Sequence, residues 1–153
     1  MKKFLLTLLF SAFLINFSFS AEKIVYLDTQ KVFTQSKAGI DLKTALQQKA
    51  EKARAEIQAK ASTVKQNDQL AMQQLQQEAM QKQQEIQKLQ QKAVENFANF
   101  VKKAVEQWAK SKGYELVVDG QAVLYGKENY DKTAEFLKFL DEKYAKEKPD
   151  FLK

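Results

Sequence analysis

The sequence has no cysteine and no histidine among its 153 residues. Without cysteine, disulfide bonds, thiolate metal sites and thiol catalysis are excluded. Without histidine, the commonest general base and the commonest metal ligand are missing. A phosphate-binding loop of the GxxxxGK[ST] type is also absent. We assign Asp28 and Asp119 to cap and turn positions and not to an acid–base pair. The sequence therefore predicts a protein that is not an enzyme, with no catalytic residues, no metal and no cofactor.

Glycine and proline are scarce, and neither occurs between Gly39 and Gly113. The intervening run is made mainly of Ala, Gln, Lys, Glu and Leu, which are good helix formers. Within it, residues 69–91 read QLAMQQLQQEAMQKQQEIQKLQQ, a glutamine-rich segment without an aromatic residue. A run of this length without a helix breaker predicts a coiled coil or a long helical hairpin.

Small apolar residues recur every three or four positions along this run, in a stripe that is typical of paired helices. The stripe comprises Leu46, Ala50, Ala53, Ile57, Ala61 and Val64, followed by Leu75, Ala79, Ile86, Leu89, Ala93, Phe97 and Phe100. Much of it is alanine, which buries little area at about 25 cal/mol per Å². The pattern predicts two loosely packed helices. Phe97, Phe100 and Trp108 are expected to pack at the base of these helices or between subunits, with contact to a bound protein as the alternative.

Short β-strand signals flank the helical run. KIVYLD at 23–28 is typical of a strand, and YELVVDGQAVLYG at 114–126 predicts a β-hairpin turning at Asp119–Gly120. Because strands so far apart in sequence can pair only if the chain returns, we expect the helices to be antiparallel. The turn is expected within 67–77, either at Asn67–Asp68 or nearer 73–76.

The predicted fold class is therefore α+β and mostly α, with a long antiparallel coiled-coil hairpin emerging from a small three-stranded body. DKTAEFLKFLDEKY at 131–144 predicts a last helix that begins after an Asp131 cap. A core this small needs oligomerisation when disulfide bonds and structural metal ions are absent. The predicted organisation is a body over 21–37 and 113–146, an arm over 38–112, and a flexible tail over 147–153.

The N-terminus has the features of a secretory signal peptide over 1–20. A positive Met1-Lys2-Lys3 precedes an apolar run over 4–15, and a cut is expected between Ser20 and Ala21. Loss of Lys2 and Lys3 lowers the net charge from +6 to +4. This mild excess does not indicate nucleic-acid binding, although it favours weak contact with an anionic membrane surface.

Two end blocks resemble the Skp/OmpH-like family of periplasmic chaperones. VYLDTQKVFTQS at 25–36 is similar to the opening of that family, and GYELVVDGQAVLYG at 113–126 followed by YDKTAEFLKFL at 130–140 is similar to its ending. The resemblance implies a periplasmic homotrimer with helical arms around a cavity. It also implies an ATP-independent holdase that keeps unfolded outer-membrane proteins from aggregating in transit. The sequence alone indicates only more than one subunit.

Two sets of residues are candidates for contacts. The client-contact candidates on the arm are Lys49, Lys52, Arg54, Lys60, Lys65, Met72, Met80, Lys82 and Lys88. The oligomer-core candidates are Ile24, Tyr26, Leu116, Val118, Val123, Tyr125, Leu137 and Leu140. The first set also has an interpretation without client binding, because lysines commonly line solvated helix faces and methionines commonly fill a helical stripe. We assign no lipopolysaccharide site, because 66–91 is poor in basic residues.

A different function class competes with the chaperone hypothesis. The chain could be a non-catalytic coiled-coil adaptor or tether of the cell envelope. A tether predicts one straight helix, about 110 Å long at 1.5 Å per residue, with no return of the chain. The direction of the second half of the helical run therefore distinguishes the two.

Overall fold

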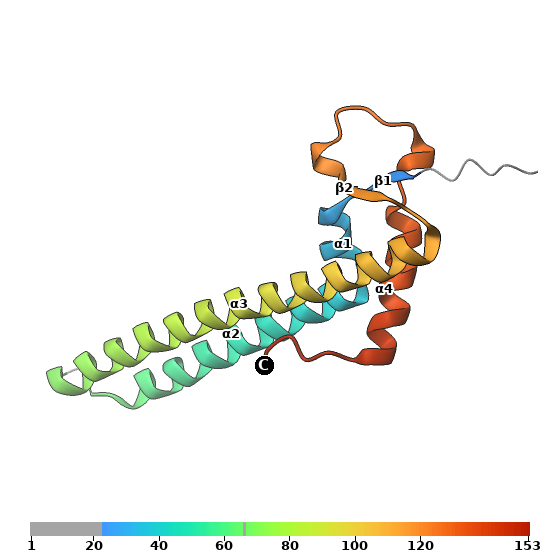
Figure 1. Cartoon of the computed structure of the whole chain (residues 1–153). Coiled ribbons are helices and arrows are strands. Elements are labelled where there is room, and N and C mark those ends of the chain that lie inside the picture. Colours follow the sequence, from blue (N-terminus) through green and yellow to red (C-terminus); the bar gives the residue numbers. More distant parts are fainter. Residues whose placement is uncertain (1–22, 66) are drawn as a thin grey trace, which may run out of the picture.

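The computed structural model describes residues 23–65 and 67–153, and the predicted signal peptide lies outside this part of the chain. Two long helices project from a small body (Figure 1). The elements in chain order are β1 (Ile24–Leu27), α1 (Thr29–Gln35), α2 (Lys37–Thr63), α3 (Gln69–Lys112), β2 (Leu116–Asp119), the 3-10 helices η1 (Gly120–Ala122) and η2 (Glu128–Tyr130), and α4 (Thr133–Glu147).

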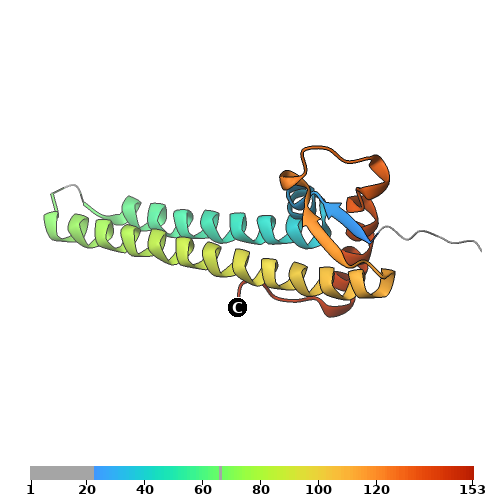
Figure 2. The same ribbon diagram turned by 45° about the horizontal axis from the view of Figure 1, so that its top comes forward.

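Helices α2 and α3 lie side by side and antiparallel, and we call this pair the arm (Figures 1 and 2). The predicted helical hairpin is confirmed. α2 ends at Thr63 and α3 begins at Gln69, where the Asp68 carboxylate accepts a hydrogen bond from the Ala71 amide at 3.0 Å. Of the two expected turn positions, the one at Asn67–Asp68 is therefore correct. The alternative at 73–76 is wrong because nothing there interrupts the helix.

The base of the arm is fixed by local capping. The Ser36 hydroxyl accepts a hydrogen bond from the Gly39 amide at 3.0 Å and begins α2. At the other end Gly113 adopts a left-handed φ of 76° and closes α3, a position that suits glycine. These two caps bring the chain back to β2 directly beside its starting strand.

The sheet has two strands, β1 and β2, which pair in parallel with Ile24 opposite Leu116. A parallel pair needs a long crossover connection, and here the arm supplies it. The predicted three-stranded sheet and the hairpin at Asp119–Gly120 are wrong for the described residues. The Asp119 carboxylate accepts from the Gln121 amide at 3.0 Å and from the Thr29 hydroxyl at 2.9 Å, so the chain enters η1 instead of reversing.

The hydrophobic core lies where the base of the arm meets the sheet and α4. Trp108 is fully buried, and its ring lies 5.0 Å from that of Tyr114 and 5.3 Å from that of Phe136. The other buried apolar residues are Val25, Leu27, Val32, Ala38, Leu42, Ala93, Phe97, Phe100, Ala104, Phe136, Leu140 and Phe151. The aromatic residues at the end of α3 thus pack at the arm base within a single chain.

The last helix begins one residue later than predicted. Lys132 occupies the N-cap position, while the Asp131 carboxylate accepts from the Thr133 amide at 2.9 Å. The Thr133 hydroxyl in turn accepts from the Asp28 amide at 2.9 Å. α4 is thereby joined to the start of α1 across the body.

The tail over 147–153, which the sequence predicts to be flexible, has a defined position in the structure. The chain leaves α4 and runs back beside the arm, as Figures 1 and 2 show. Phe151 is buried against Phe97 and Phe100, with ring centroids 5.6 Å away in both pairs. A terminal segment stays docked when it can bury a large aromatic side chain, and Phe151 supplies one.

Candidate functional site

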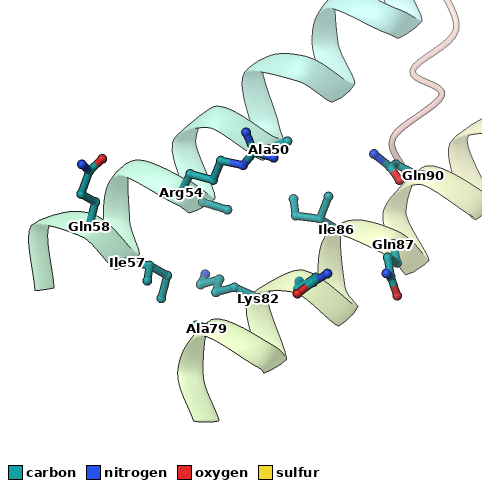
Figure 3. Close-up of a pocket in the computed structure, with 11 residues that line it drawn as sticks. Ala50, Arg54, Ile57, Gln58, Ala79, Lys82, Ile86, Gln87 and Gln90 are labelled. Atoms are coloured by element: carbon teal, nitrogen blue, oxygen red, sulfur yellow. The ribbon is translucent and has the colours of Figure 1, made fainter. Parts of the chain in front are cut away.

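An open groove runs between α2 and α3 midway along the arm (Figure 3). Its lining residues are Ala50, Ala53, Arg54, Ile57, Gln58, Ala79, Lys82, Gln83, Ile86, Gln87 and Gln90. Ile57, Lys82 and Ile86 project into the space between the helices in Figure 3. Alanines leave that space unfilled because a methyl group is too short to reach the opposite helix. The groove combines apolar surface with basic and amide groups.

Two of the predicted client-contact lysines are engaged within the arm. Lys60 pairs with Glu78 across the two helices. Lys82 lies 3.4 Å from Glu56 and 3.8 Å from Glu85. Exposed ion pairs of this kind contribute about 0–1 kcal/mol, so they hold the helices only weakly. The ion pairs therefore add only a little to the packing of the apolar stripe.

The remaining client-contact candidates are exposed on the arm, and one of them, Arg54, also lines the groove. Lys49, Lys52, Arg54, Lys65 and Lys88 are exposed. Met72 and Met80 are 41% and 60% exposed, so they do not fill the stripe between the helices. Leu70 is 66% exposed and lies two positions before Met72, so it faces a different side of α3 and adds a further exposed apolar side chain near the tip of the arm. Sequence reasoning missed Leu70, although the Leu-Ala-Met order at 70–72 signals more apolar surface than one helix face can bury.

A second apolar surface lies on the body. A shallow pocket there is lined by Ile24, Val25, Tyr26, Val118, Val123, Tyr125, Gly126, Lys127 and Tyr130. Leu124 is fully exposed and Tyr125 is 85% exposed, in the segment that follows η1. We call this pocket together with Leu116 and Leu124 the body patch. A single chain leaves it uncovered.

The structure brings most of the oligomer-core candidates together at the body patch. Ile24, Tyr26, Val118, Val123 and Tyr125 line its pocket, and Leu116 is 50% exposed on β2. Two candidates lie elsewhere. Leu137 is half-buried on α4 beside a different pocket, and Leu140 is fully buried in the core of its own chain. Leu140 therefore has no exposed surface through which it could contact a partner. The body patch also includes Leu124 and Tyr130, which were not among the predicted residues.

Charged groups near the base of the arm have local effects. The pKa of Tyr144 is raised, mainly because the side chain is partly buried. The hydrogen bond that its hydroxyl donates to Asp41 raises this pKa further. The pKa of the Asp150 carboxyl is lowered, mainly by the hydrogen bond from the Leu152 amide and next by Lys153, and Lys49 on α2 adds to this effect.

Within residues 23–65 and 67–153, no three acidic side chains converge on a point where they could bind a metal ion. The same ranges hold no helix of the length and hydropathy needed to cross a membrane.

Asp28 and Asp119 do not form a reactive pair. Asp28 caps α1 by accepting from the Lys31 amide at 2.9 Å, and Asp119 caps η1. Both act as caps, as predicted for Asp28, whereas Asp119 caps η1 and does not form the predicted hairpin turn. The described residues thus offer contact surfaces along the arm and on the body.

Comparison with known proteins agrees with this architecture. A family model described as "Outer membrane protein (OmpH-like)" matches residues 23–140. The chain is similar in fold to the crystal structure of a candidate outer membrane chaperone, OmpH-like, from Caulobacter crescentus CB15. The two are 17% identical, with a TM-score of 0.58 over 80% of this chain and 85% of that one. Comparison with curated protein sequences found no match. The matched residues include both sheet strands, the whole arm and the buried half of α4, and the chain therefore belongs to the OmpH/Skp-like family of outer-membrane chaperones.

Proposed function

We propose that this protein is an ATP-independent periplasmic holdase, which binds unfolded outer-membrane proteins between helical arms and prevents their aggregation. The observation that carries the proposal is the arm, which projects from a small body and has an open groove and exposed Met72 and Met80. Membership of the OmpH/Skp-like family supports the same assignment. Export follows from the predicted signal peptide and from the periplasmic location of the family.

The arm surface suits a client that must be released without nucleotide hydrolysis. Unfolded β-barrel precursors expose strand edges and apolar side chains that aggregate. The arm offers glutamine amides, which donate and accept hydrogen bonds, and methionines, which adapt to different partners. Each such contact is weak. Many of them in one assembly still raise the effective concentration of the client and give useful avidity.

We also propose that the body patch is the contact between subunits of a homotrimer. Large exposed apolar surfaces on soluble proteins commonly mark sites of association. Leu124 and Tyr125 project from the segment after β2 and find no cover in their own chain. The resemblance supplies the number three, and the arms of three subunits would enclose a cavity. Weak contact of the basic arms with an anionic membrane surface remains part of the proposal.

The tether alternative is not favoured. A tether needs a single straight helix, whereas α2 and α3 fold back on each other. An adaptor that serves one specific partner shares the architecture of a holdase. It would protect only that partner, whereas a holdase protects several unrelated β-barrel precursors.

The experiment is dilution of a urea-unfolded β-barrel precursor into buffer with and without the mature protein, followed by light scattering. A holdase suppresses the scattering without ATP. A double variant, Met72→Gln and Met80→Gln, should suppress it less, because the exposed methionines supply contact area and their loss leaves the core intact. Full aggregation in the presence of excess folded wild-type oligomer would rule the holdase out.

A further inference from the structure

The C-terminal tail of this chain, residues 149–153, is seated on the arm as a short peptide. Phe151 packs its ring between Phe97 and Phe100 of α3 and stacks on Tyr144 of α4, with ring centroids 6.1 Å apart and an interplanar angle of 10°. The Asn96 amide donates to the carbonyl oxygens of Phe151 at 3.0 Å and of Lys153 at 3.3 Å. We call Asn96, Phe97, Phe100 and Tyr144 the aromatic site.

The aromatic site recognises features that any polypeptide can offer. It holds one aromatic ring by edge-to-face and stacked contacts, and it binds main-chain carbonyl groups through a side-chain amide. None of these contacts requires the particular residues before or after Phe151. The Leu152 amide is the largest cause of the lowered pKa of the Asp150 carboxyl, followed by Lys153, and Lys49 on α2 contributes least, so nearby charges of the arm act only weakly on the tail.

The tail is also attached in a way that permits release. Pro149 follows the left-handed Lys148 at the end of α4, and the tail forms no helix or strand beyond it. Its contacts are the buried Phe151 ring, the partly buried Leu152 side chain, two hydrogen bonds from Asn96, and local pairs within the tail such as the Leu152 amide to Asp150. Release of residues 149–153 removes no helix or strand. The ordering of the tail opposes the gain from burying Phe151.

We propose that the aromatic site is a binding site for a short extended segment of an unfolded client that carries an aromatic side chain, and that the tail is a displaceable ligand supplied by the chaperone itself. This inference rests on the proposed function and names one place where the client is held. β-barrel precursors fit the site because their strands carry bands of aromatic residues, and unfolded strands have main-chain carbonyls without partners.

The tail competes with the client inside the same molecule. A short flexible tether gives an effective concentration on the order of millimolar, so stray aromatic peptides are kept out. A client that engages the arm at several points also gains a high local concentration, and its aromatic residue can replace Phe151. In the absence of a client, the tail covers Phe97 and Phe100 for most of the time.

The test uses the full mature chain and a fluorescein-labelled peptide of sequence KEKPDFLK, which reproduces residues 146–153. Fluorescence anisotropy gives its affinity for the wild type and for Phe151→Ala. If the tail leaves the site open about a tenth of the time, the peptide should bind Phe151→Ala about tenfold more tightly, because apparent affinity scales with the open fraction. Lys146→Ala, at an exposed position of α4 that makes none of the tail's contacts, is the matched control and should bind as the wild type does.

Two further results are expected. A peptide with alanine in place of its phenylalanine should not bind, and Asn96→Ala added to Phe151→Ala should weaken binding. A urea-diluted β-barrel precursor should displace the labelled peptide from Phe151→Ala. If the labelled peptide stays bound while aggregation of the precursor is still suppressed, the aromatic site binds only the protein's own tail and no client. The inference then fails and the holdase function stands.

A second measurement covers the case in which Phe151→Ala does not fold. The chain lacks cysteine, so Lys153→Cys can carry a single fluorophore on an otherwise unchanged protein. Addition of the precursor should make the fluorophore more mobile as the tail leaves the aromatic site. An immobile fluorophore at saturating precursor would overturn the inference. Failure of the unmodified protein to suppress aggregation would instead count against the proposed function.

Discussion

Gly39 lies directly against the backbone of Phe33 at the corner where α1 passes into α2. A Cβ atom on residue 39 would overlap the carbonyl oxygen of Phe33 and lie 2.8 Å from its carbonyl carbon. The Ser36 hydroxyl, which accepts from the Gly39 amide, would lie 3.1 Å from the same atom. The corner that aims the arm away from the body therefore depends on a residue without a side chain.

Gly39→Ala should destabilise the protein, although helix propensity alone predicts the opposite. In an open helix, alanine in place of glycine stabilises by about 1 kcal/mol. Here the added methyl group meets backbone that cannot rotate away, and overpacking costs about 1–3 kcal/mol. Urea denaturation followed by circular dichroism gives the free energy of unfolding. Gly113→Ala is the comparison, because only the left-handed φ and no crowding opposes it; an increase in stability for Gly39→Ala would contradict the corner geometry.

Asp68→Ala should loosen the tip of the arm without affecting the body. The Asp68 carboxylate caps α3 through the Ala71 amide, and loss of an N-cap costs about 0.5–2 kcal/mol. Hydrogen exchange should quicken in the first turn of α3 and stay unchanged around Trp108. Asp68→Asn keeps a side-chain acceptor and should behave almost as the wild type does. Equal protection in both variants would show that the cap does not hold the tip.

Leu124→Asp should dissociate the oligomer while the single chain stays folded. Leu124 is fully exposed in its own chain, so a charge there costs little before assembly. Buried in a subunit interface, the same carboxylate would lose its hydration without a partner. Sedimentation equilibrium should report a single chain for this variant. Gln91→Asp adds the same charge to an exposed position of the arm and should remain assembled; an assembled Leu124→Asp would move the interface elsewhere.

Tyr144 should release its proton above pH 10.0, because burial and the hydrogen bond to Asp41 raise its pKa from that value. A raised pKa in the folded state means that the contribution of Tyr144 to stability is complete below pH 10.0. That contribution is lost as the pH rises through the higher pKa of the folded protein. Subtracting the ultraviolet titration of Tyr144→Phe from that of the wild type isolates this residue. A difference curve with its midpoint at or below pH 10.0 would disprove the shift.

The arm was predictable because its determinants are local. A long stretch without glycine or proline, a repeat of apolar residues every three or four positions, and the Asp68 cap lie close together in the sequence. The strand at 24–27 and the strand at 116–119 were predictable for the same reason. Their parallel pairing was not, because it depends on where two distant caps, Ser36 and Gly113, aim the helices.

The errors share one cause. Asp119–Gly120 has the composition of a hairpin turn, yet the Thr29 hydroxyl, 90 residues away in sequence, donates to Asp119 and the chain continues into η1. The tail has the composition of a frayed end, yet it docks through Phe151. In each case a contact with a residue distant in sequence prevailed over a local preference of similar size.

The sequence by itself determined a helical hairpin between two short strands, the lack of thiol and imidazole chemistry, and the polar character of the arm. Only the tertiary structure decided the parallel direction of the sheet, the exposure of Leu124 and Tyr125, and the seat of Phe151 on the arm. Periodicity and capping act over a few residues, so they can be recognised in the sequence. Which surfaces are covered depends on how the base of the arm, α4 and the sheet meet, and residues far apart in the chain make those contacts.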